Sequence, residues 1–223
     1  MPLAIRHRDD VVAPLAALDG LHVRRERSPE VMARLQDRAV SEMGGRMVAG
    51  HRAYVASIHG IDAAFGWVAT RHARIGELGI AFEVPTGERY LWNFATLPPH
   101  RGRGIYPRLL DAIVRAESPE AERFWIIWAP ENRASGAGID KAGFVEVAEL
   151  SFDEGGRPAT SGVAGAATAQ MLEIAHVRGN LAPCWRCARA GKAWIMMCPP
   201  GECACDYQRK EVGCHDVSNA RPG

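Results

Sequence analysis

No cysteine occurs before Cys184, so all six cysteines of the 223-residue chain lie near its end. The disulfides of secreted proteins are usually spread through the fold. Thiols concentrated in one segment of a cytosolic chain more often bind metal. The absence of thiols elsewhere therefore divides the chain into a cysteine-free main part and a cysteine-rich end.

Long apolar runs and an excess of charge are also missing. No segment approaches the roughly 18 apolar residues of a membrane span, and residues 1–10 carry charges where a signal peptide needs its apolar core. With 27 basic and 26 acidic side chains, the net charge is +1, so no overall field attracts the chain to nucleic acid or anionic lipid. These absences predict a cytoplasmic protein without a membrane partner, whose binding depends on local sites.

The apolar pattern predicts one main domain of mixed strands and helices, followed by a small appendage. Early strands form hairpins, whereas the middle of the chain alternates between strands and helices. Segment 11–18 suggests a short helix, and 153–169 a loop. We expect strands at 21–24, 54–58, 63–70, 79–84, 90–97, 124–128, 144–152 and 171–177, and helices at 28–45, 105–114 and 133–142.

A basic, glycine-rich turn joins the apolar segment 90–97 to the helix that begins near Ile105. Its sequence is His100-Arg101-Gly102-Arg103-Gly104-Ile105-Tyr106. Such a turn can direct backbone amides and a positive helix end at an anion, and its arginines can bind phosphate with forked hydrogen bonds. An isolated turn of this kind also occurs as an ordinary surface loop, so its meaning depends on context.

The order of the expected elements (strand, turn, helix, strand, helix) and three sequence motifs resemble the GNAT superfamily of acyltransferases over residues 21–177. Arg101 to Tyr106 is similar to the family motif Arg/Gln-x-x-Gly-x-Gly/Ala, and Tyr106 departs from its small last residue. Asn132-Arg-Ala-Ser135 and Lys141-Ala-Gly-Phe144 are similar to the other two motifs. The resemblance implies a GNAT-like acyltransferase domain over 1–177 with a Cys-rich appendage at 178–223. It also implies the fold class α+β, with a mixed but mostly antiparallel, twisted central sheet flanked by helices.

This resemblance implies a coenzyme A site whose cofactor is acetyl-CoA or another acyl-CoA. Ala95 and Thr96 would present backbone groups to the pantetheine arm, and Asn132 and Ser135 would contact the cofactor from the other side. The pyrophosphate would be bound by the turn, at Arg101, Gly102, Arg103, Gly104, Ile105 and Tyr106.

In this family an amine attacks the thioester directly, so alignment and acid–base help carry the reaction. Ile139 stands where the family commonly has a tyrosine acid; Tyr106 or Tyr54 could replace it, or water could protonate the thiolate. For the base, we expect Glu131 and then His100. Glu83 and His72 are further options, and Trp92, Trp125 and Trp128 are either acceptor-site walls or core.

The cysteine-rich end has the spacing of a metal site. Cys184 and Cys187 are two residues apart, which lets two thiolates bind one ion. We expect one structural zinc held by Cys184, Cys187, Cys203 and Cys205. A two-zinc cluster, an iron–sulfur cluster and thiols without metal stay open as alternatives.

The sequence thus predicts an N-acyltransferase that moves an acyl group, chiefly acetyl, from acyl-CoA to an amine on a small molecule, peptide or protein. The alternative is a non-catalytic acyl-CoA sensor, suggested by the missing tyrosine and the added tail. Nucleic-acid binding through the tail ranks last, because acidic residues offset its basic ones. A homodimer stays open.

Overall fold

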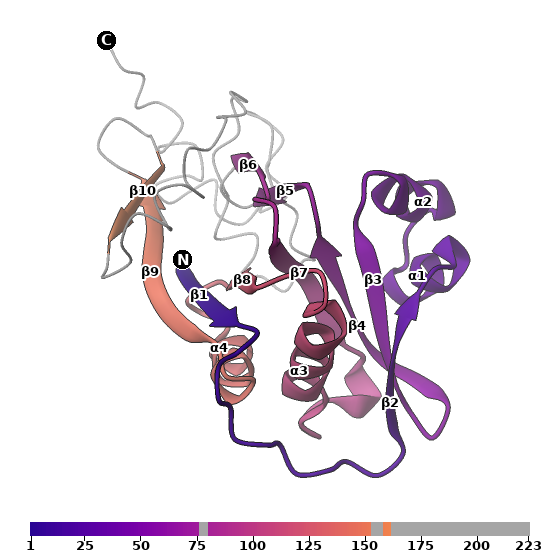
Figure 1. Ribbon diagram of the computed structural model, residues 1–223. Helices are drawn as coiled ribbons and strands as arrows, with labels where there is room; N and C mark the ends of the chain where they lie inside the picture. The colour runs from indigo at the N-terminus through magenta and orange to yellow at the C-terminus, as the bar shows by residue number, and fades with distance from the viewer. Residues whose placement is uncertain (76–79, 153–157, 162–223) are drawn as a thin grey trace, which may run out of the picture. The chain divides into compact units, whose positions relative to one another are not determined.

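The computed structural model describes residues 1–75, 80–152 and 158–161 (Figure 1). The expected strand at 171–177 and the proposed zinc ligands Cys184, Cys187, Cys203 and Cys205 lie outside the described residues, so both stay predictions. Among the described helices, none is long and apolar enough to cross a membrane.

The main sheet has eight strands in the order β10-β9-β1-β8-β7-β4-β3-β2. Within the described part, neighbouring strands are antiparallel except β7 and β8, which are parallel. The predicted mixed, mostly antiparallel sheet is confirmed. The strands are β1 Pro2–His7, β2 Leu21–Glu26, β3 Arg52–Ile58, β4 Ile61–Ala69, β7 Glu88–Thr96, β8 Arg123–Ile127, β9 Val145–Phe152 and β10 Pro158–Ser161.

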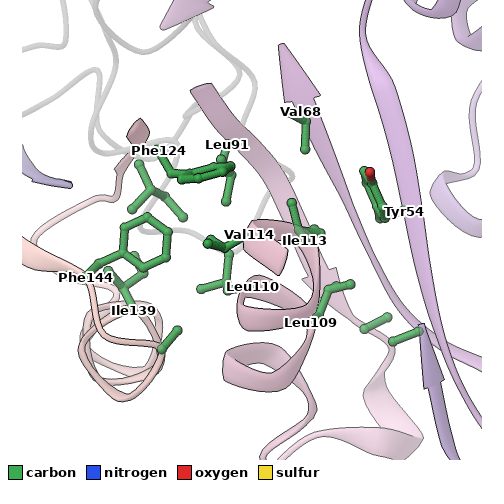
Figure 2. Packing of buried hydrophobic residues seen from close by; sticks show 14 of the residues in the cluster. Tyr54, Val68, Leu91, Leu109, Leu110, Ile113, Val114, Phe124, Ile139 and Phe144 are labelled. Carbon is green, nitrogen blue, oxygen red and sulfur yellow. The ribbon is translucent and has the colours of Figure 1, made fainter. Parts of the chain in front are cut away.

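Helices cover both faces of this sheet because its central strands are apolar on both sides. Along β3, Tyr54 and Ala56 belong to a core with α3 (Ile105–Glu117) and α4 (Arg133–Lys141). The alternate residues Ala53 and Val55 belong to a second core with α1 (Pro29–Gln36) and α2 (Val40–Val48). Figure 2 shows the first core, where Leu109, Leu110 and Ile113 of α3 lie between the sheet and the side chains of Ile139 and Phe144.

The prediction of a single helix at 28–45 is wrong in one respect, because this segment forms two helices, α1 and α2. Ser28 caps α1 at the expected start, since its side chain accepts a hydrogen bond from the Val31 amide, and proline follows it in the first turn. Asp37 then adopts a left-handed conformation (φ 51°) and ends α1. Gly44 and Gly45, at the end of the expected helix, lie inside α2.

The first strand was also misplaced. The segment 21–24 is not the first strand of the sheet, because β1 (Pro2–His7) precedes it and lies between β8 and β9. Segment 11–18 forms no helix. A buried charge fixes β1: the Arg6 Nη1 donates to Asp111 Oδ1 of α3 (3.0 Å) and to the Ala142 carbonyl after α4 (2.6 Å). The local sequence pattern around Arg6 does not indicate these partners, because they lie more than 100 residues away in the chain.

Three short strands, β5 (His72–Ile75), β6 (Ile80–Glu83) and β10, differ from the sequence-based expectation in part. β5 and β6 form a separate two-stranded sheet, of which only β6 was expected. β10 lies inside the segment expected as a loop, because residues 158–161 find backbone partners on β9.

Candidate functional site

The parallel pairing with β8 covers only the first part of β7, although it covers β8 almost to its end. Their register runs from Glu88↔Arg123 to Leu91↔Ile126, whereas β7 continues to Thr96, paired with β4 on its other side. Beyond Leu91, the backbone N–H and C=O groups of β7 that point away from β4 therefore lie outside the hydrogen-bond ladder between β7 and β8. An extended ligand can add to such an edge as a substitute strand. Ala95 and Thr96, predicted to present backbone groups to pantetheine, lie on this segment.

A bulge bends β7 where it leaves β8. The register with β4 shifts between Phe65 and Trp67, and Asn93 has a positive φ of 52°. Its side-chain amide donates to Gln36 Oε1 on α1 (2.9 Å). Opposite the bulge, a Cβ built on Gly66 would lie 2.0 Å from the Phe94 ring, so only glycine fits there. The bulge thus redirects the strand at the point of divergence.

The turn between β7 and α3 has the open N-terminus that the sequence predicted. A short 3₁₀ turn at Pro98–His100 leads into Gly102 (φ 75°) and Gly104 (φ 69°), both in a conformation that favours glycine. Gly104 is the N-cap of α3 and supplies no side-chain hydrogen bond. The first amides of a helix lack intrahelical acceptors, so this end is suited to bind an anion.

Three arginines surround this helix end. Arg101 Nε donates to the Thr96 carbonyl (3.1 Å), and Arg103 Nη1 lies 3.4 Å from His100 Nδ1. Arg108, which sequence reasoning missed, donates to the Gly104 carbonyl (2.7 Å) and twice to the Ala16 carbonyl (3.0 and 2.6 Å). Its position four residues after the N-cap could have signalled this role. The carbonyl of Thr96 is therefore engaged by Arg101 rather than free.

Tyr106 and Ser135, two of the residues expected to contact the cofactor, touch each other in the structure. The Tyr106 hydroxyl lies 3.3 Å from Ser135 Oγ, and its ring centroid lies 5.7 Å from that of Phe94. A Cβ on Gly138 of α4 would lie 2.5 Å from the Tyr106 ring, so this glycine makes room for the tyrosine. Asn132 acts as the N-cap of α4, since its Oδ1 accepts from the Ser135 amide (3.1 Å).

Tyr54, the other candidate acid, lies apart from this contact. Tyr54 donates to Glu117 Oε1 (2.6 Å) at the far end of α3, a 13-residue helix about 20 Å long. It is thus not near the turn. Glu131 is exposed between β8 and α4, and Ile139 is buried in the core.

Two tyrosine hydroxyls give the fold a predicted sensitivity to alkali. Burial raises the pKa of Tyr106 to about 12, against a smaller opposite effect of its Ser135 hydrogen bond. Burial, followed by the hydrogen bond and charge of Glu117, raises the pKa of Tyr54 above its ordinary value. The folded protein keeps protons that the unfolded chain releases near pH 10, so this stability is complete below about pH 10 and is lost as pH rises further.

We therefore expect the free energy of unfolding to fall between about pH 10 and pH 12, and to fall less steeply in Tyr106→Phe. Urea unfolding at stepped pH measures both slopes. Equal slopes in the two proteins would contradict the assignment to Tyr106.

Three kinds of comparison with known proteins found similarity in one of them, the search of solved structures. No family profile and no curated protein matches the chain. The GCN5-related N-acetyltransferase from Kribbella flavida is similar at 15% identity and TM-score 0.43, over 65% of this chain and 53% of that one. The aminoglycoside N-acetyltransferase AAC(6')-Iy in complex with CoA is similar at 18% identity and TM-score 0.47, over 63% and 98%. The acetyltransferase of GNAT family from Streptococcus pneumoniae is similar at 16% identity and TM-score 0.44, over 58% and 88%.

Proposed function

We propose that this chain is an acyl-CoA-dependent N-acyltransferase of the GNAT type, with acetyl-CoA as its donor. One observation carries the proposal. Strand β7 leaves its parallel partner β8 after Leu91 and leads through its open segment into the glycine turn that begins α3. A strand-like arm and an anionic group of one ligand would thus find adjoining sites.

In the proposed complex, the pantetheine arm of coenzyme A lies along the open segment of β7, where Ala95 offers backbone groups. The pyrophosphate accepts hydrogen bonds from amides of the turn, and Arg101 and Arg103 add charge. Asn132 and Ser135 border the cofactor from α4. The dipole of α3 and the flanking arginines both favour a negative ligand.

For catalysis, we assign Tyr106 as the acid that protonates the leaving thiolate. Its hydroxyl lies between the end of β7 and the first turn of α4, because it contacts Phe94 on one side and Ser135 on the other. Burial keeps this hydroxyl protonated at neutral pH, since it raises its pKa to about 12. This chain has Ile139 where the family commonly has its tyrosine, and Tyr106 would take over that role. Gly138, next to Ile139, leaves space for the Tyr106 ring.

Binding and turnover separate this proposal from the sensor alternative. Isothermal titration with coenzyme A tests the site, and mass spectrometry of amines incubated with acetyl-CoA tests transfer. Mass detection is preferable to a thiol reagent because the chain itself has six cysteines. Binding with N-acylated product supports the enzyme, whereas binding without product from a broad amine panel supports the sensor. Absence of binding would overturn the proposed function.

A further inference from the structure

A cluster of aromatic and basic side chains lies on the face of β7 opposite to α3. Trp92 is the first residue of β7 beyond its last pair with β8, and it pairs with Trp67 of β4. The two indole centroids are 6.2 Å apart, and both rings belong to the core beneath α1 and α2. The cluster therefore adjoins the point where the strands diverge, on the opposite side of the sheet from Tyr106.

Arg46 of α2 covers the two indoles. Its guanidinium carbon lies 5.4 Å from the Trp67 ring centroid and 4.9 Å from that of Trp92, in cation–π contact with both. Glu42 on the same helix pairs with this guanidinium at 2.7 Å, and Gln36 accepts a longer hydrogen bond at 3.4 Å. A half-buried cation thus closes the cluster on the helical side.

His51, just before β3, completes the cluster and leaves polar atoms unsatisfied. Its ring meets Trp92 edge-on, with centroids 5.1 Å apart and planes at 66°. His51 Nδ1 and Trp92 Nε1 are both buried and have no hydrogen-bond partner within the described residues. Buried polar atoms normally have partners, so two such atoms on touching rings leave hydrogen-bonding capacity that a bound molecule can use.

The charges that face His51 are mainly positive. Arg46 lies on α2, His72 begins β5, and Arg71 lies close to Gly50, where a Cβ would be 3.0 Å from its guanidinium. Desolvation first, then Arg46 and His72, lower the pKa of His51, so its imidazole is neutral at pH 7 and can accept a proton. The nearby carboxylate of Glu42 is already paired with Arg46. The same positive field favours the neutral form of a bound amine.

We propose that Arg46, His51 and Trp92 border the acceptor site, which takes a primary amine carried on an apolar or aromatic group, and that His51 is its base. This inference rests on the proposed acyltransferase function. Trp92, which is partly exposed, supplies the apolar surface, and the fully buried Trp67 supports it from below. The positive surroundings disfavour polycationic acceptors.

The bound ammonium gives one proton to His51, and the neutral amine nitrogen forms a bond to the thioester carbonyl carbon. The carbon–sulfur bond breaks, the thiolate takes a proton from Tyr106, and the new amide nitrogen releases its second proton to solvent. Solvent also carries the proton of His51 back to Tyr106. The products are the N-acyl amine, coenzyme A and one proton released to solvent.

The pH dependence of turnover tests the role of His51, with acetyl-CoA and 2-phenylethylamine as probes. In the wild-type protein, we expect kcat/KM to rise with pH along an acid limb below pH 6.5, the ordinary His value. His51→Gln should remove this limb and lower kcat about 100-fold. Arg46→Met should move the limb to higher pH, because one cause of the lowered pKa is gone and solvent reaches the ring.

Matched control variants distinguish a loss of the catalytic base from a loss of the folded structure. His22→Gln changes an exposed histidine of β2, and Arg34→Met removes the same charge from α1; both should leave the acid limb in place. Coenzyme A affinity and the melting temperature are measured for every variant. If His51→Gln binds coenzyme A normally but keeps the limb and the rate, or if spermidine is acylated faster than 2-phenylethylamine, the inference is wrong. A wild type that binds coenzyme A without turnover also overturns it, and a wild type that does not bind coenzyme A removes the proposed function itself.

A measurement without turnover gives an independent check. The imidazole of His51 is titrated by NMR in the intact chain, and the indole N–H of Trp92, identified by Trp92→Phe, is followed as 2-phenylethylamine is added to the coenzyme A complex. We expect a His51 pKa below 6.5 and a shifted Trp92 signal. An unmoved Trp92 signal at saturating amine would contradict the assigned site.

Discussion

Replacement of Gly102 with alanine is expected to weaken coenzyme A binding about tenfold or more, which corresponds to about 1.4 kcal/mol. Gly102 has φ 75°, and a Cβ built there would have no protein atom within 4 Å. The methyl group would instead enter the space assigned to the pyrophosphate, and alanine at this φ would tend to turn the neighbouring amides away. Isothermal titration of both proteins with coenzyme A measures the loss.

Gly60 offers a matched control because it has nearly the same backbone and the same open surroundings. Its φ is 81°, and a Cβ there would also have no atom within 4 Å, but it lies in the hairpin between β3 and β4. Both alanine variants should lose about 1–2 kcal/mol of stability from the left-handed conformation. Only Gly102→Ala should lose affinity. Equal affinities in the two variants would argue against the pyrophosphate site.

Glu117→Ala is expected to cost about 3–5 kcal/mol of unfolding free energy, since it removes the buried carboxylate that Arg52, Arg89 and Tyr54 share. The Glu117 carboxylate is 1% exposed and accepts hydrogen bonds from Arg52 (2.6 Å), Arg89 (2.8 Å) and Tyr54 (2.6 Å). These bonds join the end of α3 to strands β3 and β7. A loss of this size is a large part of a typical stability of about 5–15 kcal/mol.

Glu120→Ala is the control, because it touches the same two arginines from an exposed position. Its side chain is 58% exposed and lies 2.5 Å from Arg52 and 3.2 Å from Arg89. An ion pair of this exposure is expected to contribute no more than about 1 kcal/mol. Urea unfolding at neutral pH compares the two variants, and a similar loss in both would show that burial of Glu117 does not decide its effect.

The features that the sequence predicted are those whose cause is local. Ser28 with the proline after it marks the start of α1, and the His59-Gly60 pair marks the turn of the β3–β4 hairpin. The glycine turn before Ile105 shows where the proposed cofactor site begins, because positive φ angles require glycine at 102 and 104. Each of these signals is contained in a few neighbouring residues.

What the sequence did not predict depends on distant partners. Pro2–His7 becomes a strand because β8 and β9 accept it, and neither lies near it in the chain. The contact between Tyr106 and Ser135 is likewise formed by two helices, and the place of Gly138 beside the tyrosine is visible only in the fold. The approach of His51 to Trp92 joins a loop to a strand about 40 residues later, so no spacing rule could indicate it.

The place of β1 in the sheet has a consequence for the order of folding. Leu3 pairs with Ile127 on one side and with Ala148 on the other, so both edges of β1 wait for segments that are synthesised much later. Contacts of such long sequence separation form slowly, because a long loop must be closed first. The hairpin of β3 and β4, by contrast, can form from neighbouring residues. We therefore expect the half of the sheet from β2 to β7 to gain protection from hydrogen exchange first during refolding. The half around β1 would follow and set the overall rate.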